Sequence, residues 1–348
     1  MRSRARVCYR FWSSAICSIT FSTQIPRASP PGVPRYRQFL NTDPPRLAEM
    51  WRGCTNCPEL LQPLTAGLFE SLILNKPYFD RAGLIIAEDD DGIVGFAHAG
   101  FGPNDQLQSL EYDLGVTSML LVHPRVTDPA VTHELLRLSE EYLRSRGAKV
   151  LYGGSIYPLN PFYLGLYGGS ESPGILLSDE CLSAVYQQNG YQAIDQVQIY
   201  RRTVADYHAA IDRRWMQIRR KTVVASVEDP PSTSWWMACT QGEFERREVQ
   251  LLDQRMGNQL AGAVLRNLDP PAAGISRGVF GLTDLWVDER QRRQGYGAYL
   301  LNETLKYLAD QNCVALEVQT MQANTAAIGL YNKLGFTQVN TGVVYRKT

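Results

Sequence analysis

The sequence lacks the bulk features that mark membrane, nucleic-acid and metal-binding proteins. Lysine plus arginine and aspartate plus glutamate each number 35, so the net charge of zero gives no reason to expect a nucleic acid or an acidic membrane as a partner. No apolar run reaches the roughly 18 residues that a membrane-spanning helix needs. The four histidines are isolated from one another and show no metal-ligand spacing. We therefore expect a soluble globular protein with no membrane, nucleic-acid or metal site.

Cysteine is too scattered for a disulfide framework. The chain has seven cysteines in 348 residues, whereas a small disulfide-stapled secreted domain carries them densely. Cys54 and Cys57 form one C-x-x-C, but no second pair or histidine lies at zinc-site spacing from it. We interpret both as ordinary thiols. This usage favours a reducing compartment, so we expect the protein to be cytoplasmic.

Acidic residues are missing from the first 34 residues, which are basic and end in a proline-rich stretch. Three interpretations are open: a transit-type leader, a secretory signal interrupted by Arg10, and upstream sequence translated from a wrongly chosen start codon. We favour the third and leave residues 1–34 out of the fold. The remaining length suggests about two domains of roughly 150 residues each.

A weak internal repeat indicates how the two domains are organised. Residues 120–152 align without a gap on residues 285–317, with leucines and tyrosines matched at helical and strand spacing. Further on, YQQNGY at 186–191 matches YNKLGF at 331–336, at an offset smaller by 20. The first copy therefore carries about twenty extra residues, which lie in the Gly-, Pro-, Ser- and Tyr-rich stretch 153–180 and predict a long loop.

Each copy predicts the same succession of elements. A strand, a turn, an amphipathic helix, a second strand and a short helix ending at glycine follow antiparallel strands such as the hairpin pattern at 84–101. This pattern predicts an α/β protein of mixed α+β type, with two tandem domains. Each domain would be a mostly antiparallel twisted sheet with a parallel central strand pair flanked by helices. We place the domains at residues 35–200 and 201–348.

The turn ERQRRQGYG of the second copy predicts a phosphate cradle. A strand at 282–287 is followed by a loop at 288–294 and a helix from Gly297 onward. Glycines at 295 and 297 allow close approach and unusual backbone angles, so free N–H groups point outward at the positive end of the helix dipole. The arginines at 292–293 would add charge. The alternative is an ordinary surface turn.

Beyond the cradle, a second set of residues approaches the same place. The strand at 313–318 should run parallel to the strand before the cradle, because a helix connects them. Asn324 can cap a short helix that Gly335 ends in the left-handed conformation. Tyr331 lies seven residues from Asn324, on the same helix face. That face would bring a phenol and an amide toward the space between the two parallel strands.

Together these motifs resemble a known superfamily. A strand, then R-x-x-G-x-G opening a helix, a second strand, an asparagine, a helical tyrosine and a Leu-Gly-Phe ending are similar to the acetyl-CoA-dependent N-acetyltransferases known as GNAT. The specific match covers about residues 282–340, and the repeat extends it weakly over 36–348. The layout is most similar to tandem two-domain members such as mycothiol synthase, although no motif fixes that substrate.

The resemblance implies a role for each matched residue. Backbone N–H groups from Arg292 to Gly297 would bind the coenzyme A pyrophosphate, and the strand edge at 285–287 would pair with the pantetheine arm. Asn324 would contact that arm, and Tyr331 would protonate the leaving thiolate as general acid. The implied cofactor-binding set is Leu285, Trp286, Val287, Arg292, Arg293, Gln294, Gly295, Tyr296, Gly297 and Asn324.

The implied chemistry is direct attack of an amine on the thioester, so positioning and carbonyl polarisation would supply most of the acceleration. The amine must first lose a proton. Asp284 and Glu317 lie on the two parallel strands and are the candidate bases, directly or through water. The alternative for each is a polar strand residue that faces solvent or a partner.

The first copy is predicted to be degenerate. Its equivalent turn reads PRVTDPAV, in which Thr127, Ala130 and Thr132 replace the arginine and both glycines. Asp128 would repel phosphate, and Pro129 removes an N–H donor.

We expect this copy to complete the substrate cleft through its loop at 153–180, or else to be purely structural. The paired Trp235 and Trp236 could line an acceptor pocket or simply belong to the core.

The leading hypothesis is an N-acetyltransferase that moves an acetyl group from acetyl-CoA, its co-substrate, to a primary amine, with the second domain active. A non-catalytic acyl-CoA-binding or regulatory module is the alternative from another class. A transferase of the same fold that uses a longer acyl group is a third possibility. The identity of the acceptor and the oligomeric state are open.

Overall fold

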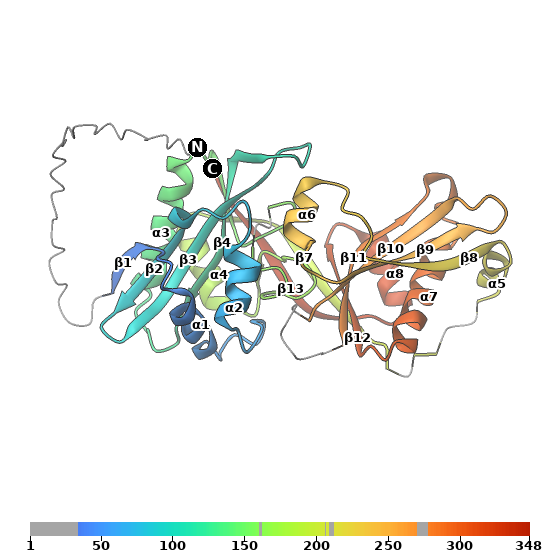
Figure 1. Ribbon diagram of the computed structural model, residues 1–348, viewed down its shortest axis with the longest axis horizontal. Helices are drawn as coiled ribbons and strands as arrows, with labels where there is room; N and C mark the ends of the chain where they lie inside the picture. The colour runs from blue at the N-terminus through green and yellow to red at the C-terminus, as the bar shows by residue number, and fades with distance from the viewer. Residues whose placement is uncertain (1–33, 160–161, 206, 209–211, 270–277) are drawn as a thin grey trace, which may run out of the picture.

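The computed structural model describes residues 34–348 except 160–161, 206, 209–211 and 270–277 (Figure 1). The predicted leader at 1–34 lies outside the described residues, apart from Pro34. The elements of the first copy, with short π- and 3-10-helical segments marked η, are β1 (Arg35–Gln38), α1 (Pro44–Gly53), α2 (Ala66–Phe69), η1 (Glu70–Leu74), η2 (Arg81–Gly83), β2 (Leu84–Asp89), β3 (Gly92–Pro103), β4 (Leu110–Val122), α3 (Ala130–Ser145), β5 (Val150–Gly153), β6 (Ile175–Leu176), α4 (Glu180–Gln188) and β7 (Gln192–Thr203).

The second copy repeats this succession. Its elements are α5 (Arg213–Arg219), β8 (Thr222–Glu228), α6 (Trp235–Gln241), β9 (Arg246–Asp253), β10 (Gln259–Asn267), β11 (Val279–Val287), η3 (Glu289–Gln291), α7 (Tyr296–Asp310), β12 (Ala315–Met321), α8 (Thr325–Lys333) and β13 (Thr337–Lys347). No helix in the described part of the chain is both long and apolar enough to cross a bilayer.

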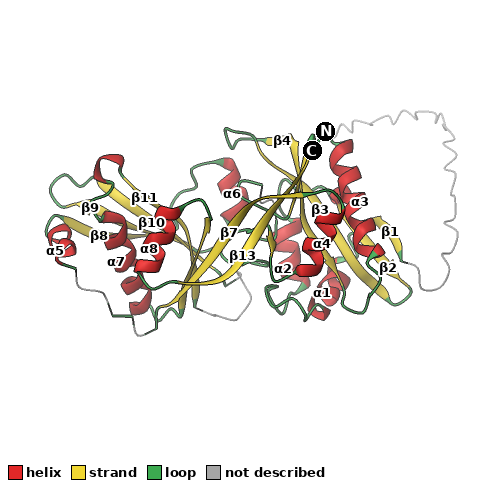
Figure 2. Cartoon of the chain, turned by 180° about the vertical axis from the view of Figure 1, so that it is seen from behind, coloured by secondary structure: helices red, strands yellow, loops and turns green. Residues whose placement is uncertain are grey.

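One sheet runs through the described part of the molecule. Its strand order is β1-β2-β3-β4-β5-β13-β7-β12-β11-β10-β9-β8, with β6 paired to β13 at the side. All pairs are antiparallel except β4 with β5 and β11 with β12, which are parallel. The mixed fold class predicted from the repeat is therefore confirmed. Helices α7 and α8 cover the second copy's part of the sheet, and α3 and α4 cover the first copy's part (Figure 2).

The two copies exchange their closing strands. β7 follows α4 of the first copy, yet it pairs along one edge with β12 of the second copy. β13 follows α8 of the second copy, yet it pairs with β5 and β6 of the first. The two exchanged strands also pair with each other and cross the middle of the molecule side by side (Figures 1 and 2). The boundary predicted at 200/201 falls inside β7, and the domain limits remain a prediction.

Because of this exchange, the apolar cores contain residues from both copies. The cluster under α7 contains Leu300, Leu301, Leu305 and Leu308, all fully buried, in agreement with the apolar face predicted for that helix. The cluster under α3 and α4 includes Val343 and Tyr345, which β13 contributes.

A third cluster, beneath α1 and α2, takes in Trp236 from α6, whose indole Nε1 donates to Pro158 O at 3.1 Å. Its ring lies 4.7 Å from that of Tyr78. Side chains from both copies therefore bury apolar area in shared cores.

Candidate active site

The second copy opens a cleft where its two parallel strands diverge. β11 and β12 pair from Val279 with Ala315 to Leu282 with Val318, and β12 then continues on β7 as far as Met321. The edge of β11 beyond Leu282 therefore faces a cavity of about 840 Å³ instead of a strand. An exposed strand edge presents N–H and C=O groups to an extended ligand.

A bulge in β11 lies at the start of this divergence. Val264 of β10 pairs with Asp284 and Leu265 pairs with Leu282, so Thr283 is the extra residue. Its hydroxyl donates to Val264 O at 3.3 Å. Bulges bend a strand and redirect its side chains, and they are enriched beside active sites. The bulge sets the direction of the strand that carries Asp284 and Trp286 along the cleft.

The turn at 288–297 forms a cradle of backbone amides. Asp288 caps the 3-10 turn by accepting from Arg290 N at 2.9 Å. Arg293 and Gly295 both adopt the left-handed conformation, with φ of 63° and 89°. Tyr299 N donates the first intrahelical bond, to Gly295 O at 3.0 Å, so the amides just before it have no helical acceptor. Such a nest at a helix N-terminus binds anions.

The polar side chains of the turn mostly stabilise its shape. Arg292 donates through Nε to Val287 O at 3.3 Å, and its Nη1 lies 3.4 Å from the Glu289 carboxylate. Gln294 donates to Arg290 O at 3.0 Å. The predicted loop thus contains a short helical turn closed by its own side chains. A Cβ on Gly295 would meet only Ile218, at 3.8 Å, so there is room for a side chain at this position.

Helix α8 forms the opposite wall of the cleft. Asn324 caps it by accepting from Ala327 N at 3.2 Å, as predicted, and Gly335 follows it with a φ of 74°. Tyr331 lies on the side of α8 that faces the core. Its ring packs against Tyr200, and the residue is 5% exposed. Burial raises the pKa of Tyr331, and the carboxylates of Glu171 and Asp284 raise it further. The phenol is therefore protonated at neutral pH and able to donate.

The cleft brings together almost all residues of the predicted site. Its lining includes Asp284, Leu285, Trp286, Val287, Arg292, Arg293, Gly295, Tyr296, Gly297, Asn324 and Tyr331. Gln294 lies in the same turn with its amide bonded back into it. Glu317 is not among the lining residues. The predicted base pair is therefore split, because Asp284 reaches the cleft and Glu317 does not.

Glu317 instead joins the two copies. It is 1% exposed, and its carboxylate accepts from Ser170 N at 2.6 Å and from Arg201 Nη2 at 2.7 Å. Ser170 belongs to the loop inserted in the first copy, and Arg201 belongs to β7. This arrangement supports a positioning role for Glu317 more than the role of a base.

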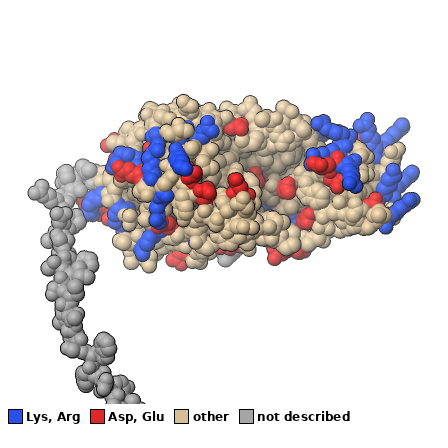
Figure 3. Space-filling view, turned by 90° about the horizontal axis from the view of Figure 1, so that it is seen from above, with Lys and Arg blue, Asp and Glu red and all other residues tan. Residues whose placement is uncertain are grey.

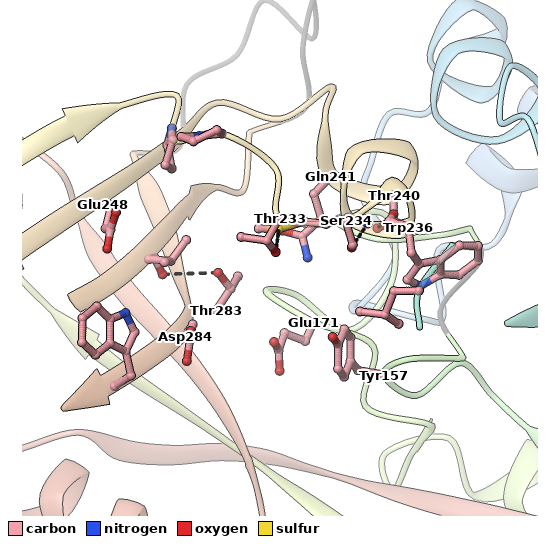
Figure 4. A pocket seen from close by; sticks show the side chains of 16 residues that line it. Tyr157, Glu171, Thr233, Ser234, Trp236, Thr240, Gln241, Glu248, Thr283 and Asp284 are labelled. Carbon is pink, nitrogen blue, oxygen red and sulfur yellow. Dashed lines mark hydrogen bonds between the residues drawn. The ribbon is translucent and has the colours of Figure 1, made fainter. Parts of the chain in front are cut away.

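A second cavity, of about 470 Å³, is lined by residues of both copies (Figure 4). Thr283, Asp284 and Trp286 line both cavities, so this stretch of β11 is their common wall. Figure 4 shows Glu171 and Tyr157 of the first copy facing Thr283 and Asp284. The remaining lining residues are Leu107, Pro230, Pro231, Thr233, Ser234, Trp236, Met237, Thr240, Gln241, Glu248 and Val264.

Two carboxyl groups in this second cavity have raised pKa values. Burial raises the pKa of Glu171 to about 7, with smaller contributions from Asp284 and Glu317 and an opposing one from the Arg266 guanidinium. Burial, followed by the charge of Glu248, raises the pKa of Asp284. A carboxyl group that titrates near neutral pH inside a cleft, as Glu171 does, is a candidate for proton transfer.

Residues 206–336 match the model of the Acetyltransferase (GNAT) family. The second copy therefore contains a segment that is similar to GNAT acetyltransferases. Two relatives overlap this chain in short stretches. N-alpha-acetyltransferase 30 of Xenopus laevis is 29% identical over 83 residues, which are 24% of this chain and 30% of that protein. Aminoglycoside N(6')-acetyltransferase type 1 of Serratia marcescens is 36% identical over 67 residues, which are 19% of this chain and 46% of that protein. The chain thus spans a third to a half of these relatives.

Solved structures match both copies together. A tandem GNAT protein from the clavulanic acid biosynthesis pathway has a TM-score of 0.64 at 12% identity, covering 90% of this chain and 98% of its own. The glucosamine N-acetyltransferase region of a fungal GH3 β-N-acetylglucosaminidase has a TM-score of 0.66 at 16% identity, covering 91% of this chain and 38% of that chain. The tandem GNAT fold is therefore established across the two copies.

The first copy has no open equivalent of the GNAT cradle in its described residues. Asp128 accepts from Ala130 N at 2.9 Å, so its own carboxylate occupies an amide at the start of α3, and Pro129 supplies no donor. β4 and β5 part after Thr117 and Gly153, and Phe162 and Tyr163 of the inserted loop pack into the same apolar core as Met119 of β4.

Sequence reasoning missed Glu171, although it selected the loop that carries it. A glutamate in a Gly- and Ser-rich stretch has no local pattern that marks it as a site residue. Trp236 does line the second cavity, and it also packs in the core of the first copy, so the two predicted roles coexist. Trp235 is 37% exposed.

Proposed function

We propose that the protein is an N-acetyltransferase that transfers an acetyl group from acetyl-CoA directly to a primary amine, with the GNAT domain active. One observation carries this proposal. The amide cradle, the unpaired edge of β11 and the Tyr331 phenol all line a single cavity of about 840 Å³. A phosphate site, an extended-chain site and a proton donor in this order suit a pantetheine thioester.

Each part of the cleft has a distinct task in this proposal. The amides of the cradle bind the pyrophosphate, and the edge at 285–287 pairs with the pantetheine amides, with Asn324 beside the arm. The thioester then lies where β11 and β12 diverge. The turn from Arg292 to Gly297 lines the cavity, and its short helical turn holds the amides in place before the ligand arrives.

The reaction needs no covalent enzyme intermediate. The neutral amine attacks the thioester carbonyl carbon, the C–S bond breaks, and Tyr331 gives its proton to the departing sulfur. Its raised pKa keeps that proton available at neutral pH. Asp284, on the common wall of the two cavities, is placed to hold the amine or relay its proton. Positioning the two reactants where the two cavities meet supplies most of the acceleration.

The names of the relatives describe N-acetylation, of an aminoglycoside in one case and of an N-alpha position in the other. Both acceptors are amines, which supports an amine acceptor here. The five cysteines in the described part of the chain are free, in line with our proposal of a cytoplasmic location.

Calorimetry with acetyl-CoA tests the cradle. Wild type should bind one equivalent, and Gly295→Glu should weaken binding at least 100-fold because the carboxylate fills and repels the phosphate site. Gly257→Glu is the matched control, since Gly257 has a similar φ of 71° and open space around it in the β9–β10 turn.

Thiol release with an amine panel then tests turnover. Binding without turnover of any amine would support the acyl-CoA-binding module, and faster turnover of longer thioesters would support a different acyl group. Absence of binding by wild type would refute the proposal.

A further inference from the structure

We propose that the cavity between the two copies is the acceptor site, that it takes a small hydroxylated primary amine without an acidic group, and that Glu171 of the first copy receives the ammonium proton. This inference rests on the proposed function and names its acceptor class and its base. In this arrangement the degenerate copy supplies a catalytic residue to the GNAT domain.

The loop that carries Glu171 is fastened to the sheet of the second copy. Gln319 of β12 donates to Gly168 O at 2.7 Å and to Glu171 O at 3.2 Å, and Glu317 accepts from Ser170 N. Gly281 of β11 lacks a side chain where the Ser170 Cβ approaches, since an added Cβ would lie 2.4 Å from it. These contacts from two strands fix the backbone on both sides of Glu171, so its position does not depend on a mobile loop tip.

The charge of the cavity selects a cation. Glu171, Asp284 and Glu248 line it, whereas no lysine or arginine does so among the described residues. In the space-filling view the middle of the molecule is hollowed and edged mainly by acidic side chains, with Lys and Arg gathered toward the two ends (Figure 3). An ammonium group is stabilised there, and a carboxylate or phosphate on the same acceptor would be repelled.

The rest of the lining suits a hydroxylated body. Tyr157 and Trp286 present ring surface to the cavity. Gln241 Oε1 is buried without a hydrogen-bond partner, so it can accept from a hydroxyl or an amine. Thr233 and Thr240 also line the cavity, and the Thr240 hydroxyl donates to Trp236 O at 2.8 Å. A volume of about 470 Å³ accommodates a molecule the size of an amino sugar.

Glu171 is positioned next to the reaction centre. The cavity meets the acetyl-CoA cleft at Thr283 and Asp284. The negative charge of Glu171 contributes to the raised pKa of Tyr331, which lines that cleft. An amine in contact with Glu171 can therefore approach the thioester where the two cavities meet.

The strands and the helix packed around Glu171 bring charged and titratable groups close to its carboxylate. Arg266 from β10 stabilises the carboxylate, whereas Asp284 from β11 and Glu317 from β12 destabilise it, and Tyr331 from α8 is protonated. With burial as the largest contribution, these groups place the pKa near 7. The carboxylate is thus substantially ionised at neutral pH and basic enough to accept a proton from an ammonium group.

Every proton in this step is accounted for. Glu171 takes one proton from the ammonium nitrogen, and the nitrogen lone pair then forms the C–N bond. As the C–S bond breaks, Tyr331 protonates the sulfur, and the second surplus proton on nitrogen restores the phenol. Glu171 finally releases its proton to solvent, so the net products are the amide, coenzyme A and one proton.

The test compares Glu171→Gln, Asp284→Asn and the exposed control Glu111→Gln in the full-length chain. Acetyl-CoA affinity is measured by calorimetry, and kcat/KM for glucosamine is measured by thiol release from pH 5.5 to 9. Wild type and the control should show kcat/KM rising around pH 7. Glu171→Gln should lower kcat/KM at pH 7 by about 100-fold or more. It should also shift the rise to the pH at which the amine itself deprotonates, with acetyl-CoA affinity unchanged.

Either of two results would overturn the assignment of the base: Glu171→Gln within twofold of wild type with the same pH profile, or loss of the neutral rise only in Asp284→Asn. The acceptor class is tested with glucosamine, glucosamine 6-phosphate, glycine and a tetrapeptide. Glucosamine should exceed each of the others at least 10-fold in kcat/KM.

If the peptide or an anionic amine is preferred, or if acetyl-CoA binds and glucosamine is not turned over, the acceptor class is wrong. If acetyl-CoA does not bind to wild type, the proposed function itself fails.

Discussion

Replacing Glu317 by glutamine separates a positioning residue from a base. In the folded chain the buried carboxylate accepts from Ser170 N and pairs with Arg201, whose side chain is 49% exposed. Glutamine retains one acceptor oxygen for Ser170 but loses the charge, which reduces one charge-assisted hydrogen bond to a neutral one and removes a half-solvated ion pair. These losses amount to about 1–2 kcal/mol of unfolding free energy. Alanine also leaves the buried Ser170 N–H without a partner, for a total of about 2–4 kcal/mol.

Urea unfolding of Glu317→Gln, Glu317→Ala and the control Glu111→Gln measures these differences, and the pH profile of kcat/KM measures the role in catalysis. Loss of a negative neighbour lowers the pKa of Glu171, so the neutral rise in Glu317→Gln should survive and move to lower pH. An unchanged stability together with loss of that rise would refute the reasoning, because Glu317 would then be the base and its contacts to the loop would be incidental.

Two further substitutions test the remaining parts of the molecule. Tyr331→Phe should lower kcat by at least 10-fold with little change in acetyl-CoA affinity, as measured by thiol release and calorimetry beside the exposed control Tyr112→Phe, and an unchanged kcat would exclude Tyr331 as the acid. Tyr345→Ala in β13 removes a ring stacked 5.7 Å from Tyr186 and should destabilise the chain by about 3–5 kcal/mol. Because the copies share strands, calorimetric scanning should show a single transition shifted as a whole, and a shift confined to one of two transitions would contradict that coupling.

The cleft proposed for acetyl-CoA was predictable because its parts are local in the sequence. The cradle needs left-handed backbone at Gly295 and a helix directly after it, and the wall opposite needs a cap at Asn324. Each of these features can be recognised from a few consecutive residues. Tyr331 follows from helical spacing to that cap. Even so, the left-handed Arg293 and the folding back of Arg292 onto Val287 were not foreseen, since they arise from the closure of the turn.

The proposed acceptor site was not predictable in the same way, because its residues meet only through long-range packing. Glu171 and Asp284 are separated by more than a hundred positions and lie in different copies. The choice between Asp284 and Glu317 depended on which face of a strand each occupies once β12 turns onto β7. The repeat indicated two domains, but no local pattern shows that the strands after their last helices change places.

The position of β13 also has a consequence for protein synthesis. β13 begins at residue 337, and its partner β5 ends at residue 153. At about 5–20 residues per second, a ribosome needs about 10–40 s to translate the intervening stretch. During that time the nascent first copy has an uncovered edge on β5 and lacks the Tyr345 ring beside Tyr186. We expect chaperones that shield strand edges to engage the chain in this interval, and the native sheet to close only after residues 337–347 have left the exit tunnel.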